Sequence, residues 1–272
     1  MPELPEVETV RNTLKKHVLN NIIKECIITY DKIIENIETD EFAEKVVNQK
    51  INDIKRLGKW LLFELDDYYL LSHLRMEGKY FIRENDYDDL NHVHVVFVLD
   101  NKKLLYQDTR KFGKMHLIKK EDLFKEKPIK DLGYEPWDSE LTSKYLKEKY
   151  KKKNIPIKTV LLDQSIITGI GNIYADEILF LCQISPLRKA SELTKKDLNN
   201  IISFTRKVLE KAIKEGGTTI RTYSSDGVHG RFQQSLYVHN KLGRKCLLCS
   251  SPIEKTRVGG RGTYYCPKCQ KR

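Results

Sequence analysis

No apolar run in the 272 residues approaches the roughly 20 that a helix needs to cross a bilayer, which argues against a membrane-spanning segment. The first residues are acidic where a signal peptide carries lysine or arginine, so a secreted protein is not expected. The sequence also lacks internal repeats and low-complexity stretches, which argues against a solenoid or a fibrous array. We therefore expect a globular protein of the cytoplasm.

Cysteine is scarce, with six in the chain, and a cytoplasmic protein is not expected to pair them as disulfides. Cys26 and Cys182 stand alone in apolar contexts, which is typical of small core residues. The other four follow the pattern C-x2-C-x16-C-x2-C, in which each two-residue spacing lets two thiolates reach one ion. Four protein ligands leave no open position, so the pattern predicts one structural zinc ion. Its ligands are Cys246, Cys249, Cys266 and Cys269.

Acidic residues are outnumbered, with 38 Asp and Glu against 49 Lys and Arg, and the net charge of +11 suggests a polyanionic partner. They are fewest in the last 32 residues, where Glu254 stands against nine basic residues. A zinc-folded hairpin there would display its basic side chains to phosphates. These are Lys255, Arg257, Arg261 and Lys268. The chain has 272 residues, of which 40% are hydrophobic. This length is ample for a hydrophobic core and allows one large domain or two.

The opening stretch MPELPEVETV predicts a helix start. Proline fits a first turn because it has no N–H to leave unpaired, and Glu6 and Glu8 face the positive end of the helix dipole. Apolar residues then recur at helical spacing, at Val7, Val10, Leu14 and Val18. A helix start does not account for Pro2 and Glu3, which stand before it.

The period of the apolar residues changes along the chain. Five segments alternate with period two, which predicts antiparallel strands in a sandwich or a barrel. They are residues 59–66, 68–74, 92–100, 103–108 and 114–120. From about residue 138 the period becomes helical, and Thr194 with Asp197 forms a capping pair for a helix that Gly216 stops. A β-rich domain therefore precedes a helical one, with 125–138 as the connection.

A tight turn with Gly169, Gly171 and Asn172 precedes an apolar helix. It is a poor dinucleotide fingerprint, because a third glycine and a parallel-sheet unit are missing. Glycines that let the backbone approach closely, followed by a helix N-terminus, suit a DNA phosphate.

Six motifs occur in order along the chain: PELPEVET at 2–9, LGKW at 57–60, SHLRMEG at 72–78, DTRKFG at 108–113, GIGNIYADEIL at 169–179 and GGRGTYYCPKCQ at 259–270. Together they resemble the bacterial formamidopyrimidine-DNA glycosylases. The resemblance implies an α+β multidomain protein. Its parts are an N-terminal antiparallel β-sandwich flanked by an N-terminal helix (1–130), a helix–two-turns–helix domain (131–235) and a zinc-finger β-hairpin (236–272).

The resemblance also implies a mechanism. In this family the initiator methionine is removed, and the amine of Pro2 becomes the nucleophile at C1′ of the damaged nucleotide. A terminal amine suits this task because its pKa, near 7.7–8.0, leaves far more of it neutral at pH 7 than of a lysine. Glu3 corresponds to the general acid or base and Lys59 to the lysine that binds the flanking phosphate. Glu6 matches a further acid near the site, and its helix-start role has equal weight.

An everted base leaves a gap in the stack. The resemblance assigns Met76, Arg110 and Phe112 to fill it, as a flexible plug, a donor to the orphaned base and an aromatic wedge. Without the resemblance, Met76 and Phe112 would each be interpreted as an ordinary core residue, because methionine and phenylalanine are more often found in the core. A loop at 216–234 is expected to close over the base and to be mobile without DNA. Phosphate contacts are assigned to Lys59, His73, Asn172 and Arg261.

The implied function is excision of oxidised purines (8-oxoguanine and formamidopyrimidines) from double-stranded DNA, by a bacterial, cytoplasmic monomer with zinc and no organic cofactor. Base loss is followed by cleavage of the abasic strand, through β,δ-elimination from an iminium at Pro2. Two alternatives stay open. The first is an endonuclease VIII-like enzyme for oxidised pyrimidines, although such enzymes usually lack PELPEVET and the RKFG wedge. The second is a non-catalytic zinc-ribbon DNA-binding protein, which has no need for Pro2 and Glu3.

Overall fold

The computed structural model describes residues 2–218 and 232–271. The described residues form two compact units, one of residues 2–130 and one of residues 131–218 together with 232–271. Met1 and most of the loop expected at 216–234 lie outside the described residues. No helix in the described ranges is long and apolar enough to cross a membrane.

The described part of the N-terminal unit contains eight strands, all paired antiparallel. They are β1 (Glu25–Ile28), β2 (Asp53–Leu57), β3 (Trp60–Glu64), β4 (Tyr68–His73), β5 (Lys79–Arg83), β6 (Val93–Val98), β7 (Lys103–Gln107) and β8 (Lys114–Lys119). One four-stranded sheet has the order β2-β3-β4-β8 and the other the order β1-β6-β7-β5. The period-two segments left a sandwich or a barrel open, and the two separate sheets make it an antiparallel sandwich, as the family resemblance implied.

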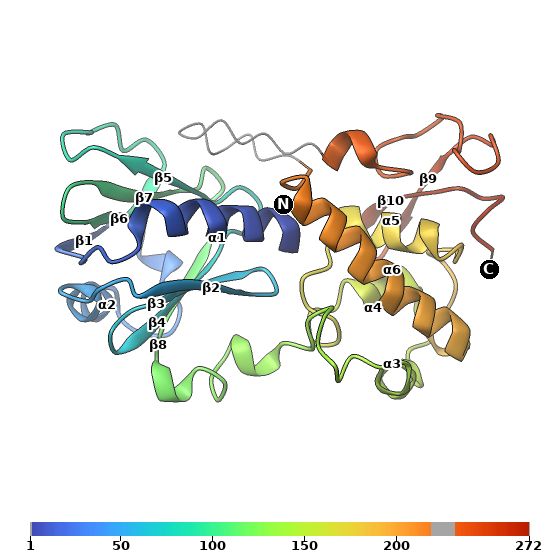
Figure 1. The fold of residues 1–272 in the computed structure, drawn as a ribbon, viewed down its shortest axis with the longest axis horizontal. Coiled ribbons are helices and arrows are strands. Elements are labelled where there is room, and N and C mark those ends of the chain that lie inside the picture. Colours follow the sequence, from blue (N-terminus) through green and yellow to red (C-terminus); the bar gives the residue numbers. More distant parts are fainter. Residues whose placement is uncertain (1, 219–231, 272) are drawn as a thin grey trace. The chain divides into compact units, whose positions relative to one another are not determined.

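Helix α1 (Leu4–Val18) covers one side of the sandwich. The apolar residues that predicted it, from Val7 to Val18, are buried in the same core as residues of both sheets. In Figure 1 the helix runs beside β2, with which it is in contact. The predicted helix start is confirmed. A second helix, α2 (Thr39–Val46), packs against β1.

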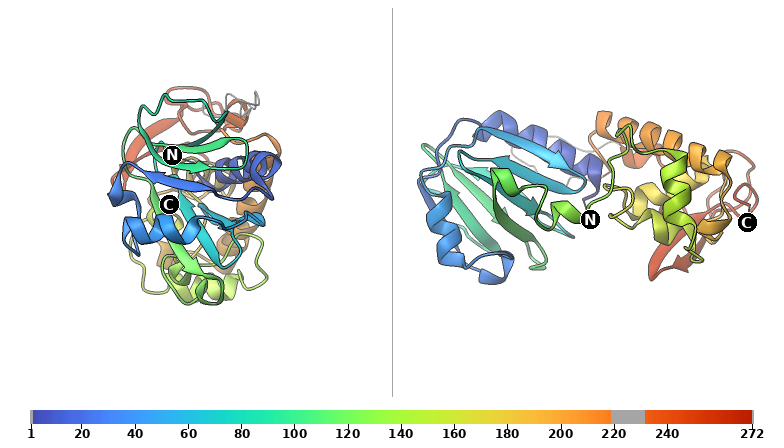
Figure 2. Two further views of the ribbon diagram at one scale, coloured as in Figure 1. Left: turned by 90° about the vertical axis from the view of Figure 1, so that its left-hand side faces the viewer. Right: turned by 90° about the horizontal axis from the view of Figure 1, so that it is seen from below.

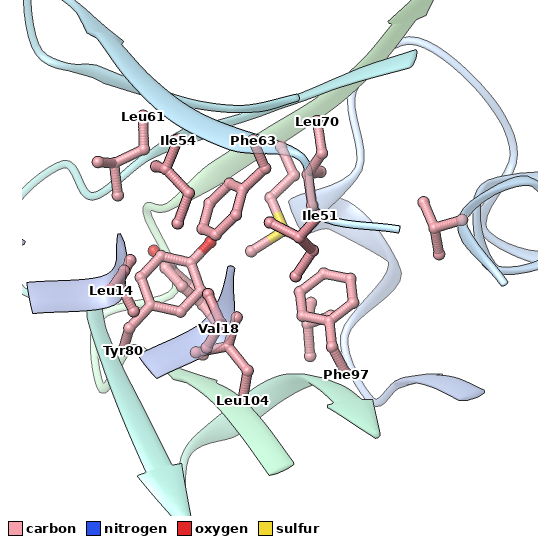
Figure 3. Close-up of a cluster of buried hydrophobic side chains, with 14 of the residues drawn as sticks. Leu14, Val18, Ile51, Ile54, Leu61, Phe63, Leu70, Tyr80, Phe97 and Leu104 are labelled. Atoms are coloured by element: carbon pink, nitrogen blue, oxygen red, sulfur yellow. The ribbon is translucent and has the colours of Figure 1, made fainter. Parts of the chain in front are cut away.

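The core of the N-terminal unit lies where the two sheets face each other. Phe63 of β3 and Tyr80 of β5 meet there with ring centroids 5.6 Å apart, beside Leu14 and Val18 of α1 (Figure 3). The Tyr80 hydroxyl donates to Ser72 Oγ of β4 at 2.7 Å. This buried hydrogen bond ties one sheet to the other.

Strands β1, β2 and β5 were not predicted. Each buries few side chains: none in β1, only Ile54 in β2 and only Tyr80 in β5. With so few apolar positions the period-two signal is weak. The five predicted strands are present, and each is shorter than expected by one to three residues.

The C-terminal unit combines helices with a zinc-finger hairpin. Its main elements are α3 (Ser143–Tyr150), α4 (Ile157–Leu161), α5 (Asn172–Leu181), α6 (Lys195–Lys214), β9 (Glu254–Val258) and β10 (Arg261–Tyr265). Thr194 caps α6 by accepting from Asp197 N at 3.2 Å, and the Asp197 carboxylate accepts from Thr194 N at 2.9 Å. This capping box confirms the predicted helix start. Helix α5 lies between α6 and the β9–β10 hairpin (Figure 2).

Candidate active site and DNA-binding residues

Pro2 stands immediately before the N-terminus of α1, whose N-cap is Glu3. Glu6 Oε2 accepts the backbone N–H of Glu3 at 2.8 Å, as one half of a capping box. Glu3 is 1% exposed and Glu6 is 3% exposed. Glu6 lies in the first turn of α1, as the helix-start interpretation expected, and its capping bond to Glu3 was not predicted. Glu3, which was expected to precede the helix, is its cap.

Lys59 lies in a two-residue hairpin turn between β2 and β3. Gly58 opens the turn with a φ of 57°, which glycine adopts without steric cost. Lys59 is only 6% exposed, so it is not the ordinary surface lysine that its turn alone would suggest. Arg56 ties this turn to α1, because its guanidinium donates to Glu8 Oε2 at 2.9 Å and to the carbonyl oxygen of Gly58 at 3.1 Å.

His73 ends β4 with a fixed and neutral ring. Its Nδ1 accepts the N–H of Arg75 at 3.0 Å, which places the ring proton on Nε2. Burial, together with the charges of Arg75 and Lys59, lowers the pKa of His73 from 6.5 to about 3. At neutral pH, any phosphate contact of His73 is therefore a hydrogen bond from Nε2 and not an ion pair.

Met76, Arg110 and Phe112 lie on two loops, one between β4 and β5 and the other between β7 and β8. Phe112 is 48% exposed, and Met76 is half-buried. The guanidinium carbon of Arg110 lies 4.8 Å from the ring centroid of Phe112, in a cation–π contact. Neither Met76 nor Phe112 belongs to the buried core, so the alternative of ordinary core residues is wrong.

Asn172 is the first residue of α5 and follows the Gly169–Gly171 turn. Gly169 has a φ of 101°, and its N–H donates to Gln164 Oε1 at 2.9 Å, which holds the turn. Asn172 Nδ2 donates to the carbonyl oxygen of Gly262 in β10 at 3.1 Å. The side chain of Asn172 is therefore oriented by the zinc-finger hairpin.

Lys158 of α4 is completely buried. It was not singled out from the sequence. Its ammonium donates to Asp176 Oδ1 at 2.6 Å, to Thr263 Oγ1 at 2.8 Å and to the carbonyl oxygen of Gly262 at 3.1 Å. Asp176 Oδ2 also accepts from Tyr264 N at 3.2 Å. This buried ion pair fastens α4 and α5 to the strand that begins with Arg261.

Arg261 opens β10 directly after the turn Gly259–Gly260. Both glycines have a positive φ, 55° and 76°, as in the type I′ turns that favour glycine. A Cβ on Gly259 would lie 2.8 Å from Thr159 Oγ1 of α4, so the turn packs closely against this helix. Arg261 itself is exposed, which suits a contact with phosphate.

The four cysteines of the predicted zinc site converge, with all Sγ atoms within 4.8 Å of one another. The Sγ–Sγ distance is 3.9 Å for Cys246 and Cys269 and 3.5 Å for Cys249 and Cys266. A tetrahedron with zinc–sulfur bonds of about 2.3 Å has sulfur–sulfur edges of about 3.8 Å, so the arrangement fits the metal. These cysteines hold one structural zinc ion.

Cys26 and Cys182 lie outside the metal cluster. Cys182 is buried, and Cys26 packs partly buried against the core of the N-terminal unit. Burial raises the pKa of the Cys26 thiol to about 12, so it stays protonated and unreactive.

The predicted site residues are divided between the two units. The N-terminal unit holds Pro2, Glu3, Glu6, Lys59, His73, Met76, Arg110 and Phe112. The C-terminal unit holds Asn172, Arg261 and the zinc ligands. The burial of Lys158 and Asp176 was missed because a single charged side chain carries no sequence sign of its partner. Glu8 was assigned only to the helix start, and its contact with Arg56 was not predicted.

Family models match three consecutive parts of the chain. The formamidopyrimidine-DNA glycosylase N-terminal domain matches residues 1–115. The formamidopyrimidine-DNA glycosylase H2TH domain matches residues 132–224, and the zinc finger found in FPG and IleRS matches residues 243–272.

Individual proteins are similar over the full length. A Bacillus cereus protein named formamidopyrimidine-DNA glycosylase is 49% identical over 275 residues, which cover 100% of both chains. A protein of the same name from Ureaplasma parvum is 45% identical, with 99% of this chain and 100% of the relative covered. A solved structure of Lactococcus lactis Fpg in complex with DNA containing an abasic site is 38% identical and matches with a TM-score of 0.93 over 100% of both chains. The wild-type Lactococcus lactis enzyme with DNA containing N7-benzyl-Fapy-dG matches equally well, at 38% identity and a TM-score of 0.93 over 100% of both chains.

Proposed function

This chain belongs to the formamidopyrimidine-DNA glycosylase family, and on that premise we propose a role for each residue of its site. The protein is a base-excision repair enzyme for oxidised purines, a DNA glycosylase with lyase activity at abasic sites, and it binds damaged DNA. Since its relatives are bacterial, we place it in the cytoplasm with the chromosome. The assignment of roles depends on one observation: Pro2 directly precedes a buried pair of capping carboxylates.

Pro2 is the nucleophile in this proposal, once Met1 has been removed. About a tenth of an ordinary terminal amine is neutral at pH 7, against less than about a thousandth of a lysine. The neutral amine attacks C1′, and the damaged base leaves. The iminium that forms makes the C2′ proton acidic. Loss of this proton expels the 3′ phosphate, and a second elimination expels the 5′ phosphate.

Glu3 moves the protons that this chemistry needs. As a general acid it protonates the sugar ring oxygen while the ring opens. Glu6 supports it, because its carboxylate fixes the backbone N–H of Glu3 at 2.8 Å. The start of α1 thereby sets the direction of Glu3 relative to the nitrogen of Pro2.

Each unit contributes side chains that bind phosphate. In the N-terminal unit, Lys59 supplies a positive charge beside the lesion and His73 a neutral N–H donor. In the C-terminal unit, Asn172 and Arg261 bind through an amide and a guanidinium. The zinc ion supports Arg261, because it folds the hairpin on which this side chain stands.

The two exposed loops fill the gap left by the everted nucleotide. Phe112 enters the stack as a wedge, and Arg110, stacked on its ring, donates to the orphaned base. Met76 fills the remaining space with a flexible apolar side chain. The exposure of Phe112 supports this role, because a half-exposed aromatic ring on a loop has apolar surface to bury in DNA.

Borohydride trapping tests the proposal. Reduction during turnover on an 8-oxoguanine duplex should join the enzyme to DNA through residue 2, as located by digestion and mass spectrometry. A variant that retains Met1 has a tertiary amide at this nitrogen and should form no adduct. Pro2→Gly should retain some activity through its free primary amine, and Glu3→Gln should bind DNA without excising the base. An adduct at Lys59, or excision with Met1 still attached, would overturn the assignment.

A further inference from the structure

The loops 74–78 and 108–113 are fastened to each other, and we propose that Asp108 and the Glu77–Thr109 pair are positioning residues that hold them as one preformed wedge. The inference rests on the gap-filling function proposed for the residues at the loop tips. It adds that the two loops enter the duplex together and not independently.

Asp108 organises its own loop. It is 1% exposed, and its two carboxylate oxygens accept three backbone N–H groups. Oδ1 accepts from Arg110 at 3.0 Å, while Oδ2 accepts from Phe112 at 2.9 Å and from Gly113 at 2.8 Å. Lys111, with a φ of 57°, makes the left-handed turn between them. Hydrogen bonds to a charged acceptor are stronger than neutral ones, so one side chain fixes the backbone beneath both tip residues.

A hydrogen bond joins this loop to its neighbour. Thr109 Oγ1 donates to Glu77 Oε2 at 2.6 Å, and Glu77 directly follows Met76. The neighbouring loop is itself closed by a bond from Gly78 N to the carbonyl oxygen of Leu74 at 2.9 Å. The two loops are 32 residues apart along the chain at this contact.

Both loops also rest on one buried hydroxyl, that of Tyr106. A Cβ added to Gly78 would lie 2.2 Å from the Tyr106 hydroxyl oxygen, and one added to Gly113 would lie 1.8 Å from it. Tyr106 is completely buried and packs against Tyr80 with ring centroids 5.2 Å apart. The glycine at the end of each loop is therefore needed for close packing on a common floor.

This arrangement has a consequence for base eversion. A segment that is ordered before it meets its partner loses less conformational entropy on binding than a flexible one. Loops held by Asp108 should therefore open the stack faster than loops that must order on the DNA. Loosening one loop should also impair the contribution of the other.

The direct test replaces Asp108 by alanine. Two substrates are compared: 8-oxoguanine in a fully stacked duplex, and the same lesion in an unpaired bubble that needs no unstacking. We expect kcat/KM to fall about tenfold or more on the duplex and far less in the bubble, because three bonds to a charged acceptor are lost. The fluorescence rise of 2-aminopurine placed beside the lesion should slow to the same extent. Asp108→Asn keeps one acceptor oxygen, so its kcat/KM on the duplex should lie between that of the wild type and that of Asp108→Ala.

Matched variants separate positioning from folding and from the proposed function. Asp66→Ala removes a carboxylate that also accepts a backbone N–H, from Lys50 at 2.8 Å, but touches neither loop, so it should leave the ratio of the two substrates unchanged. In the double variant, the effects of Phe112→Ala and Asp108→Ala on duplex excision should not add in full. If Phe112→Ala alone lowers duplex excision and Asp108→Ala lowers it further by its full effect, the positioning role of Asp108 is wrong, whereas the gap-filling function of Phe112 is kept. If Phe112→Ala has no effect on the duplex, the gap-filling function itself is wrong.

Thr109→Val keeps the inference testable should Asp108→Ala not fold. Thr109 and Glu77 are both exposed, so their bond is not needed for the core. Loss of this bond should lower the duplex-to-bubble ratio about threefold, the size expected for one hydrogen bond. A Thr109→Val enzyme with the wild-type ratio would show that the two loops act independently.

Discussion

Removing the buried charge of Lys158 should damage the C-terminal unit more than any change at its surface. Lys158→Met keeps the length of the side chain but removes the ammonium that binds Oδ1 of Asp176, whose side chain is 0% exposed. Asp176 then keeps the contacts of its Oδ2, with His239 Nδ1 at 2.8 Å and Tyr264 N at 3.2 Å. An uncompensated buried charge costs about 3–5 kcal/mol. Since a whole domain is stable by only about 5–15 kcal/mol, we expect the free energy of unfolding of this unit to fall by at least about a fifth.

The two tryptophans of the chain allow each unit to be followed separately. Trp60 is buried in the N-terminal unit, whereas Trp137 belongs to the C-terminal unit and donates to Glu210 Oε1 at 2.9 Å. In a Trp60→Phe background, fluorescence during urea unfolding reports the C-terminal unit. With an m value of about 2 kcal/mol per M, the midpoint should fall by about 1.5–2.5 M in Lys158→Met.

Lys153→Met provides the matched control. Lys153 pairs with Asp163 at 3.3 Å, but their side chains are 38% and 34% exposed, so loss of this pair should cost less than about 1 kcal/mol. The reasoning is refuted if Lys158→Met shifts the midpoint no further than Lys153→Met does. That result would mean that the remaining contact of Asp176 with His239 Nδ1, at 2.8 Å, compensates the carboxylate without Lys158.

Three further outcomes are expected. Lys59→Ala and Arg261→Ala should each make the slope of log affinity against log salt shallower by about 0.9. Fluorescence anisotropy on a lesion duplex measures this slope, and unchanged slopes would mean that neither residue contacts phosphate. Cys249→Ser should release the zinc, measured by a chromophoric chelator, and weaken duplex binding about tenfold or more, whereas near-normal affinity without zinc would count against the finger. Because the pKa of His73 is lowered from 6.5 to about 3, the unfolded chain binds a proton that the native protein does not, so this residue makes stability fall as the pH drops through that range. His73→Asn should therefore flatten the pH dependence of the unfolding free energy by about 1.4 kcal/mol per pH unit between pH 6.5 and 3, and an unaltered slope in urea titrations would show that His73 titrates normally.

Periodicity predicted the elements that bury one continuous apolar face. Helix α6 is an example: its buried residues recur at helical spacing, and its capping box joins two residues three apart, so every signal is local. Strand β2 gave no such signal, because only Ile54 of its five residues is buried. It is a strand because β3 pairs with it along its whole length. That reason depends on tertiary structure and is absent from the segment itself.

The residues that support the site were beyond the reach of sequence reasoning for a similar cause. Lys158 is joined to Gly262 across 104 residues of chain, and before folding it resembles the many solvated lysines around it. Asp108 was within a recognised motif, yet its task of holding three N–H groups becomes visible only when the loop is built. Motifs identified the residues assigned to touch DNA, and the structure was needed to find those that hold them in place.

The two interpretations of the opening stretch, a helix start and a catalytic terminus, are compatible because one contact serves both. A helix needs an acceptor for the first N–H groups that have no intrahelical partner, and Glu6 provides it for Glu3 at 2.8 Å. A nucleophile needs a backbone that does not fray, and residues at a chain end fray unless they are tied down. Capping α1 through Glu3 and Glu6 therefore also immobilises the residue that follows Pro2. A terminus that began its helix with exposed polar residues would have the same amine, but nothing would hold Glu3, the proposed proton donor, beside it.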